Sequence, residues 1–214
     1  MRVVFGGTFD PVHIGHLRMA NTLAEVLSVK QVSMMPCFKA VHKLEVGASS
    51  EHRVGMLALA KADDPLLALD TREIKRDKAS YTFDSLCEHR EELGDESLCF
   101  VMGMDAADGL SSWFKVERFS ELTHLVIINR SVEKKAFGGK QAVAAKLEKF
   151  GFTQAGSESD LKKVPVGLYI FVDLPLLEIS STSIRNRIKQ ELSIRYLVTD
   201  AVRGYICDNA LYQN

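Results

Sequence analysis

A string rich in glycine and histidine lies between the first apolar run of the chain and its first helical pattern. It reads Gly-Gly-Thr-Phe-Asp-Pro-Val-His-Ile-Gly-His, spans residues 6–16 and directly follows Val3-Val4-Phe5. Adjacent glycines allow a sharp turn and a close approach of the backbone to a ligand. His13 and His16 share one face at the start of the expected helix. Because a helix N-terminus exposes N–H groups and partial positive charge, the string predicts a phosphate-binding loop.

Other roles are open to this string. Glycines after a strand can mark only a turn, and the two histidines can be capping or core residues. A metal site is a further alternative, but no cysteine or carboxylate cluster completes a ligand set beside the two imidazoles. Neither G-x-x-x-x-G-K-[ST] nor G-x-G-x-x-G occurs in the chain, so the string is neither of the two most common nucleotide motifs.

The composition is that of an ordinary globular protein. The 214 residues, 46% of them hydrophobic and 26% charged, suit one domain with a sizeable core. The formal net charge of −1 gives no basic field, so we expect no nucleic-acid partner. The cysteines lack C-x-x-C spacing and are expected to be reduced. No apolar run approaches the ~18 residues of a membrane helix and no signal peptide precedes the first strand, so we expect a cytoplasmic protein without a membrane partner.

Strand-like apolar runs alternate with helical patterns, which predicts an α/β fold, a parallel sheet flanked by helices. The expected strands are Arg2–Phe5, Gln31–Met35, Leu66–Asp70, Leu98–Met102, His124–Ile128 and Leu168–Val172. The expected helices are Leu17–Leu27, Glu51–Ala62 with Ser50 as N-cap, Thr82–Glu92, Val116–Leu122, Lys140–Phe150 and a small C-terminal helical portion at Thr182–Lys189 and Thr199–Cys207. Residues 131–165, rich in Lys, Glu, Gly and Ser, are expected to be a surface insertion in a single domain spanning 1–214.

Polar loops follow several of these strands. In an open parallel sheet, ligands bind beyond the carboxyl ends of the strands, where the strand order reverses. The string at 6–16 lies at such an end, as do Pro36–Lys43 and Gly103–Asp105. We therefore expect these three loops to form one site.

A second polar cluster opens a helical pattern near the C-terminus and reads Ile-Ser-Ser-Thr-Ser-Ile-Arg over residues 179–185. Hydroxyl groups at this position cap a helix, and capping alone would explain them. Arg185 follows one turn inside the helix, where its guanidinium is suited to bind a phosphate with two hydrogen bonds. Together with the first string, the cluster indicates a second phosphate-binding segment.

These two segments suit the transfer of a nucleotidyl group. That reaction requires a protein to hold two phosphates in line and to neutralise charge on the leaving pyrophosphate. Backbone N–H groups, imidazoles and guanidinium groups do both. We expect His13 and His16 to hold the phosphates, and Thr8 and Phe9 to present backbone N–H groups to the nucleotide.

With these motifs and Gly103-Met104-Asp105, the chain resembles the H-x-G-H nucleotidylyltransferase superfamily and, within it, the bacterial nicotinate-nucleotide adenylyltransferases. The matching segments keep their order, at residues 5–16, 36–43, 80–82, 103–113 and 179–185. The resemblance implies a Rossmann-like fold and transfer of the adenylyl group of ATP to nicotinate mononucleotide, which gives nicotinate adenine dinucleotide and pyrophosphate. It also implies direct in-line attack without a covalent enzyme intermediate, with Mg²⁺ bound through the ATP phosphates.

The resemblance assigns roles to individual residues. The catalytic residues are expected to be His13, His16 and Arg185. The expected ATP-binding residues are Gly7, Thr8, Phe9, His16, His42, Lys43, Gly103, Asp105, Ser181, Thr182 and Arg185. The expected mononucleotide-binding residues are Ser80, Tyr81, Thr82, Trp113, Phe114 and Arg130. Although a lone tryptophan usually serves packing, Trp113 is expected to stack on the pyridine ring, and backbone N–H groups near Thr82 and Phe114 to receive the carboxylate.

Two departures from the family's pattern bear on the second substrate. Lys39-Ala40-Val41 precedes His42 where the family usually has two prolines, and Asn129-Arg130-Ser131 replaces the family's Arg-Arg-Pro. They leave open an adenylyltransferase for the amide mononucleotide or for both forms.

Other classes of protein also stay open. A nucleotide-binding regulatory protein that kept the fold is one, and a metal-dependent hydrolase with His13 and His16 as ligands is another. Phosphopantetheine adenylyltransferases and cytidylyltransferases share the first motif, but they are usually shorter and lack a region that matches Ser80–Thr82 and Trp113. The oligomeric state cannot be read from the sequence.

Overall fold

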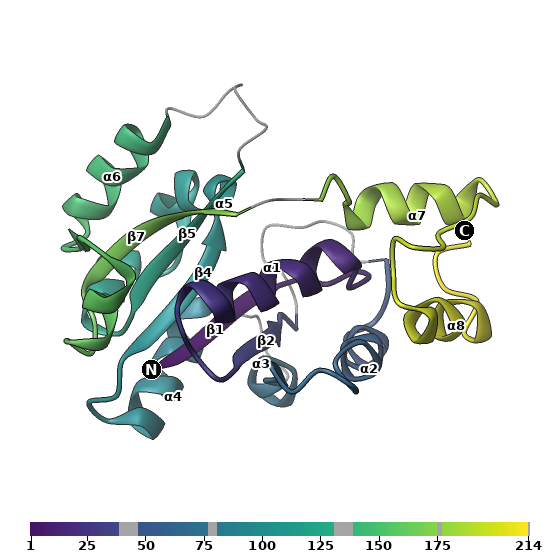
Figure 1. The fold of residues 1–214 in the computed structure, drawn as a ribbon, viewed down its shortest axis with the longest axis horizontal. Helices are drawn as coiled ribbons and strands as arrows, with labels where there is room; N and C mark the ends of the chain where they lie inside the picture. The colour runs from purple at the N-terminus through teal and green to yellow at the C-terminus, as the bar shows by residue number, and fades with distance from the viewer. Residues whose placement is uncertain (39–46, 77–80, 131–138, 175–176, 214) are drawn as a thin grey trace.

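The computed structural model describes residues 1–38, 47–76, 81–130, 139–174 and 177–213, and Figure 1 shows their arrangement. In these residues seven strands form one sheet in the order β3-β2-β1-β4-β5-β7-β6, and every neighbouring pair is parallel. The strands are β1 (Arg2–Gly7), β2 (Val32–Pro36), β3 (Leu67–Leu69), β4 (Leu98–Gly103), β5 (His124–Arg130), β6 (Thr153–Gln154) and β7 (Leu168–Leu174). The predicted parallel α/β sheet is confirmed.

Helices connect the strands and cover the sheet. The α-helices are α1 (Ile14–Val26), α2 (Ser50–Ala60), α3 (Arg72–Arg76), α4 (Thr82–Leu93), α5 (Met104–Asp108), α6 (Gly139–Lys149), α7 (Ser181–Lys189) and α8 (Asp200–Asp208). The 3₁₀-helices are η1 (Leu110–Ser112), η2 (Val116–Glu121) and η3 (Glu158–Lys162). The helix α8 packs beside α2 at one end of the molecule (Figure 1). None of the helices in the described residues combines the length and the apolar character that a membrane span requires.

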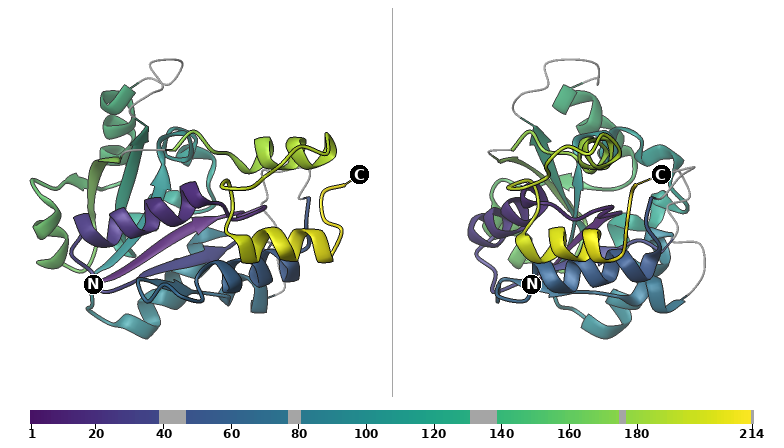
Figure 2. Two further views of the ribbon diagram at one scale, coloured as in Figure 1. Left: turned by 45° about the vertical axis from the view of Figure 1, so that its right-hand side comes forward. Right: turned by 90° about the vertical axis from the view of Figure 1, so that its right-hand side faces the viewer.

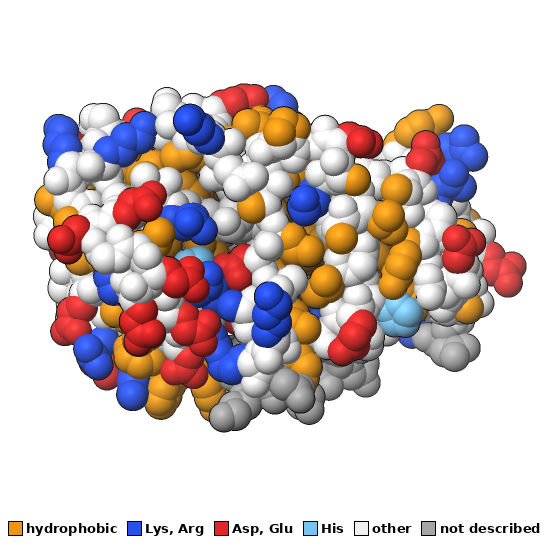
Figure 3. Space-filling model, turned by 90° about the horizontal axis from the view of Figure 1, so that it is seen from below, with side chains coloured by type: hydrophobic (Ala, Val, Ile, Leu, Met, Phe, Trp, Pro, Cys, Tyr) orange, Lys and Arg blue, Asp and Glu red, His pale blue; other side chains and the backbone are white. Residues whose placement is uncertain are grey.

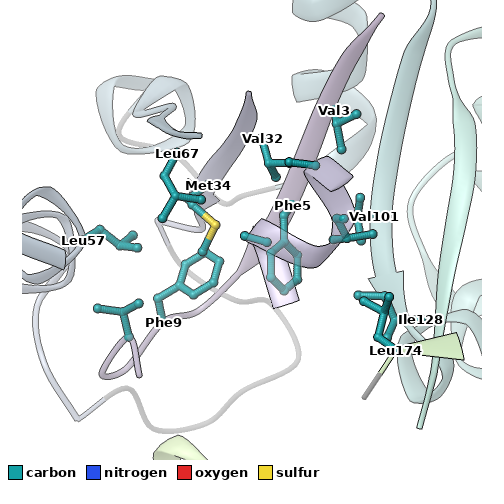
Figure 4. Close-up of a cluster of buried hydrophobic side chains, with 14 of the residues drawn as sticks. Val3, Phe5, Phe9, Val32, Met34, Leu57, Leu67, Val101, Ile128 and Leu174 are labelled. Carbon is teal, nitrogen blue, oxygen red and sulfur yellow. The ribbon is translucent and has the colours of Figure 1, made fainter. Parts of the chain in front are cut away.

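Two hydrophobic clusters bury the two faces of the sheet. Side chains alternate along a strand, so Val3 and Phe5 of β1 point into one cluster and Val4 into the other. Side chains of α1, α2, α7 and α8 complete the first cluster, in which Phe9 lies near Met34 (Figure 4). Side chains of α4, α5 and α6 complete the second. Burial on both faces explains why the strands are nearly continuous apolar runs in the sequence.

The strand order reverses between β1 and β4. From β1 the chain first builds β2 and β3 on one side, and then crosses to β4 on the other side. Gly7 pairs with Pro36 in register, so the loops after β1 and β2 begin side by side. β1 points toward the end of the molecule that α7 and α8 occupy (Figure 2). Ligands of open parallel sheets bind at this reversal, beyond the carboxyl ends of the strands.

The predicted strands are all present, with ends shifted by one or two residues, whereas several short elements were not predicted. They include α3, α5 and β6, whose five, five and two residues are too few to show a period, and the 3₁₀-helices η1 and η3. Ser49, not Ser50, is the N-cap of α2, because its Oγ accepts a hydrogen bond from the N–H of His52 at 3.3 Å. The predicted helix at Val116–Leu122 is the 3₁₀-helix η2.

The expected surface insertion at 131–165 is integrated into the fold wherever the structure describes it, at 139–165. Val143 and Leu147 of α6 are fully buried in the second cluster. β6 pairs with β7 and extends the sheet by one strand. Leu161 of η3 is buried, and its carbonyl oxygen accepts a hydrogen bond from Ser97 Oγ at 2.5 Å. The polar composition of the stretch reflects its outward-facing residues.

We predict that His124 makes the fold sensitive to acid. This side chain on β5 is fully buried; its Nδ1 accepts from the N–H of Leu168 at 3.0 Å, and its Nε2 donates to the carbonyl of Val164 at 2.9 Å. Burial lowers the pKa of His124 below its usual value of about 6.5. The unfolded chain therefore takes up this proton first, so the stabilisation is present above about pH 6.5 and is lost as the pH falls below it.

The variant His124→Ala tests this prediction. We expect it to lose about 1–3 kcal/mol of unfolding free energy at pH 8, because buried partners lose their hydrogen bonds. The difference from the wild type should shrink at pH 5, where protonation of the unfolded chain already weakens the wild type. Urea unfolding at both pH values measures it, and an equal difference at both would contradict the prediction.

Candidate active site

The first motif folds as a loop between β1 and α1, with His13 as the N-cap of the helix. His13 Nδ1 accepts a hydrogen bond from the N–H of His16 at 3.3 Å. The two imidazole rings stack with their centroids 3.6 Å apart and 23° between their planes. His13 is therefore a capping residue, as one alternative held, and this role fixes its tautomer. With Nδ1 as the acceptor, the neutral ring carries its proton on Nε2, as a donor suited to a phosphate oxygen.

The N-terminus of α1 differs from the expectation of open backbone N–H groups. The N–H of Ile14 donates to the carbonyl of Leu197 at 2.9 Å, and the N–H of His16 donates to His13. These two groups are satisfied within the protein. The imidazoles, rather than these N–H groups, are thus the parts of the helix start suited to meet a phosphate.

Glycines allow the loop to pack around its side chains. A Cβ at Gly15 would lie 3.0 Å from His13 Nδ1, so only glycine leaves the His13 ring in place. A Cβ at Gly7 would lie 2.7 Å from the ring of Phe9. Phe9 has a left-handed backbone (φ 52°), and its side chain is buried in the first cluster (Figure 4). Its side chain thus belongs to the core, which limits any contact of Phe9 with a nucleotide to its backbone.

The structure brings the second predicted segment against the first. Ser181 Oγ donates to the carbonyl of Pro11 at 2.9 Å, and Arg185 Nη1 donates to the carbonyl of Asp10 at 2.7 Å. Ser180 caps α7, because its Oγ accepts from the N–H of Ser183 at 3.1 Å. Arg185 Nη2 also lies 3.4 Å from Thr182 Oγ1. The hydroxyl and guanidinium groups of 181–185 therefore share one surface with the loop that carries His13 and His16 (the histidine loop).

Two buried charged residues, which the motifs did not single out, hold this surface together. Asp10 accepts hydrogen bonds from the N–H of Gly47 at 2.7 Å and of Ala48 at 3.1 Å. Arg53 of α2 is buried and donates to the carbonyls of Thr8 and Phe38, each at 2.9 Å. Both tie the first loop to the chain that flanks residues 39–46. Only the position of Asp10 inside the motif gave a signal for it.

A cavity of about 580 Å³ opens at the carboxyl ends of β1 and β4. Residues from both expected groups line it: Gly7, Thr8, Gly103 and Asp105 from the ATP group, and Tyr81, Thr82, Trp113 and Phe114 from the mononucleotide group. Its volume is in the range of small-molecule sites. The loops after β1 and β4 meet here as the sheet topology predicts.

One wall of the cavity is aromatic. Trp113 packs edge-on against Phe100 and Phe119, at centroid distances of 6.3 and 6.2 Å, while it lines the cavity. Phe114 is 45% exposed and lies 4.9 Å from the ring of Tyr81. The ammonium of Lys115 sits 4.9 Å from the centre of the Phe114 ring, a cation–π distance. Trp113 thus packs on the core and also lines the cavity. Lys115 adds a positive charge beside Phe114 that the sequence motifs did not reveal.

Hydrogen bonds and ion pairs join α3 to α4, with Arg72 Nη1 at 3.1 Å from Glu92 Oε1 and Arg76 Nη2 at 2.9 Å from Glu88 Oε1. Glu73 lines the cavity, is buried and accepts from Ser85 Oγ at 2.8 Å. Asp70, before α3, lies 3.1 Å from His89 Nε2 and 2.8 Å from Arg72 Nε. Burial favours a raised pKa for Asp70, but the hydrogen bonds from His89 and Arg72 hold the pKa well below its usual range. Acidic and basic side chains also lie close together on the face of the molecule that Figure 3 shows.

Several expected site residues lie outside this description. His42, Lys43 and Ser80 fall outside the described residues, and so does the side chain of Arg130, whose backbone ends β5. Among the residues that are described, no group of three or more His, Cys, Asp or Glu side chains could hold a metal ion.

The sheet order and the histidine loop at its reversal define an α/β protein of the Rossmann-like class. The chain belongs to the cytidylyltransferase-like family, whose model matches residues 4–187 and so includes both expected phosphate-binding segments. The family resemblance predicted from the motifs is confirmed.

Curated relatives of the chain carry a more specific name than the family does. The chain is 40% identical to a protein of Marinobacter nauticus over 94% of its length and 92% of that protein, and 40% identical to a protein of Cellvibrio japonicus over 98% and 97%. Both are named as probable nicotinate-nucleotide adenylyltransferases. Among solved structures, the nicotinic acid mononucleotide adenylyltransferase of Plasmodium falciparum in complex with NaAD matches with a TM-score of 0.73. This match has 20% identity and covers 98% of this chain and 96% of that one, so it shows the fold.

Proposed function

We propose that this chain is an adenylyltransferase that joins the adenylyl group of ATP to nicotinate mononucleotide, a step of NAD biosynthesis. The contact between the two phosphate-type segments carries the proposal: Arg185 and Ser181 hydrogen-bond to the loop of His13 and His16. The aromatic cavity beside that loop supports a second, pyridine-bearing substrate. The names of relatives with 40% identity support this pair of substrates.

The reaction proceeds by direct displacement at phosphorus. A phosphate oxygen of the mononucleotide attacks the α-phosphorus of ATP. The bond between that phosphorus and the oxygen that bridges the α- and β-phosphates breaks. Nicotinate adenine dinucleotide and pyrophosphate result, with no covalent bond to the enzyme. His13 and His16 lie at the helix start and donate to the phosphate oxygens, and Arg185 neutralises charge beside them. Thr8 and Gly7 bring the backbone close to the nucleotide, and Asp105 accepts hydrogen bonds from ribose hydroxyls.

Magnesium enters this reaction on the phosphates of ATP. The groups around the histidine loop are imidazoles, hydroxyls and a guanidinium, which suit phosphate oxygens. Mg²⁺ prefers oxygen ligands and commonly binds through substrate phosphates. His42 and Lys43 are assigned to the same triphosphate by the family resemblance.

The mononucleotide occupies the aromatic side of the cavity. Trp113 and Phe114 border the pyridine ring, with Tyr81 and Thr82 at the start of α4, and Ser80 and Arg130 complete the proposed contacts. The positive charge of Lys115 beside Phe114 favours a carboxylate over a neutral amide. The chain acts as one nucleotidylyltransferase domain, and its four free thiols suit the cytoplasm.

Pyrophosphate release with ATP and each mononucleotide tests the proposed function. We expect turnover with both substrates present and a higher kcat/KM for the acid than for the amide. Equal or better use of the amide would overturn the choice of substrate. Tight ATP binding without turnover on any mononucleotide would instead support a regulatory protein, and stoichiometric zinc in elemental analysis would support a hydrolase.

A further inference from the structure

The carboxylate of Asp10 takes no part in the proposed chemistry, yet it is 3% exposed and fully engaged in the fold. Its Oδ2 accepts from the N–H of Gly47, and its Oδ1 accepts from the N–H of Ala48 and from the hydroxyl of Tyr212 at 2.7 Å. A buried carboxylate requires such partners, because its desolvation is otherwise costly. Arg185 Nη1 also lies 3.7 Å from Asp10 Oδ2. Asp10 thus connects its own loop to three distant parts of the chain: residues 47–48, Arg185 and Tyr212.

Each of these parts bears on the ATP side of the proposed site. Asp10 lies in the histidine loop, and Arg185 is one of the expected phosphate-binding residues. Gly47 and Ala48 directly follow residues 39–46, the segment in which the sequence places His42 and Lys43. Asp10 fixes Gly47 and Ala48 through these two hydrogen bonds. The mononucleotide wall, formed by Tyr81, Trp113 and Phe114, lies on other elements.

Tyr212 reaches Asp10 from the C-terminal end of the chain. After α8, Ala210 (φ 48°) and Tyr212 (φ 65°) adopt left-handed backbones, which residues with a Cβ rarely do. These turns bring the Tyr212 ring to a site where it is 7% exposed. A Cβ at Gly47 would lie 2.9 Å from this ring and from Arg185 Cδ, so the three residues pack together. Such strain is kept where surrounding contacts over-determine it.

We propose that Tyr212 is a positioning residue of the ATP subsite. Its hydroxyl holds the Asp10 carboxylate in the orientation that fixes Gly47, Ala48 and Arg185. This inference rests on the proposed function and deepens it, because it assigns ATP binding to a contact made by the C-terminal segment. Burial and the neighbouring Asp10 carboxylate raise the pKa of Tyr212, which keeps its hydroxyl protonated as the donor.

The variant Tyr212→Phe removes one hydroxyl and keeps the packed ring. We expect the KM for ATP to rise by about 5- to 10-fold, as loss of a hydrogen bond to a charged group would cause. The KM for the mononucleotide should stay within about twofold, because its proposed contacts lie elsewhere. Tyr205→Phe is the matched control: it removes another tyrosine hydroxyl, 3.1 Å from His52 Nδ1, outside the ATP subsite. Both KM values should be unchanged in the control.

A double-mutant cycle tests whether Tyr212 acts through Asp10. Asp10→Asn replaces one carboxylate oxygen by an amide that cannot accept a hydrogen bond. We expect this variant to raise the KM for ATP at least as much as Tyr212→Phe does. The double variant should raise it no further than the larger single effect, since one network is broken only once. Multiplied effects in the double variant would contradict the proposed route.

The outcomes separate this inference from the proposed function. An unchanged KM for ATP in Tyr212→Phe, or an equal rise for both substrates, would overturn the inference while wild-type turnover stands. If the wild type turns over no mononucleotide, the proposed function fails, and the dissociation constant of ATP, measured by calorimetry for both proteins, tests the inference instead. If Tyr212→Phe does not fold, Gly47→Ala is the second variant, because its Cβ displaces Tyr212 and Arg185. An unchanged KM for ATP there would also overturn it.

Discussion

Substitution of His16 by alanine is expected to lower kcat by about 10²-fold or more, as does the loss of a single group that stabilises transition-state charge. The His16 ring is held between its neighbours, stacked on His13 and 5.0 Å from the ring of Phe9 in an edge-on contact. It is therefore positioned before substrate binds, which is what gives such a group its effect on rate. In the proposed mechanism His16 acts on charge that develops during displacement, so kcat and kcat/KM should fall together.

Steady-state pyrophosphate release with saturating ATP and nicotinate mononucleotide measures this effect. His52→Ala is a suitable control, since it removes an imidazole near the start of another helix, α2, away from the cavity. It should keep wild-type kcat. Thermal unfolding should show that both variants fold. A kinetically silent His16→Ala would remove His16 from the mechanism.

The sequence was sufficient for the parts of the site that are local in the chain. The strand before Gly6, the glycines and the helix after His13 all lie within one short stretch, so their order alone predicts a loop at a sheet edge. The same holds for Ser181 and Arg185, which lie on one turn of α7. Each segment was predicted separately to bind phosphate, and the contacts of Ser181 with Pro11 and of Arg185 with Asp10 show that the two lie together in the fold.

Contacts between distant parts of the chain could not be predicted in this way. The N–H of Ile14 donates to the carbonyl of Leu197, and the hydroxyl of Tyr212 donates to Asp10. Each of these hydrogen bonds joins residues far apart in the sequence, and the residue types alone do not indicate which residue is the partner. The helix α3 escaped prediction for another reason: its residues 72–76 are mostly charged, and ion pairs with α4 rather than an apolar stripe hold it.

Substitution of Trp113 is expected to change the KM of one substrate and not that of the other. Trp113→Ala should raise the KM for nicotinate mononucleotide by about 10- to 100-fold, which corresponds to the loss of one aromatic stacking contact and of packed wall area. The KM for ATP should stay within about twofold, because the proposed phosphate contacts lie on the histidine loop and α7, which are separate elements from the segment that holds Trp113. Initial rates measured while each substrate is varied in turn give both constants.

The control must show that this effect comes from the cavity and not from a weakened core. Phe171→Ala also removes an aromatic side chain packed on the second cluster, but Phe171 does not line the cavity. We expect it to lower the thermal unfolding temperature without a selective change in either KM. Since Trp113 also packs on Phe100 and Phe119, its removal should lower stability as well. The selective rise in the mononucleotide KM, not the loss of stability, is thus the result that assigns Trp113 to the pyridine ring, and equal changes in both KM values would withdraw that assignment.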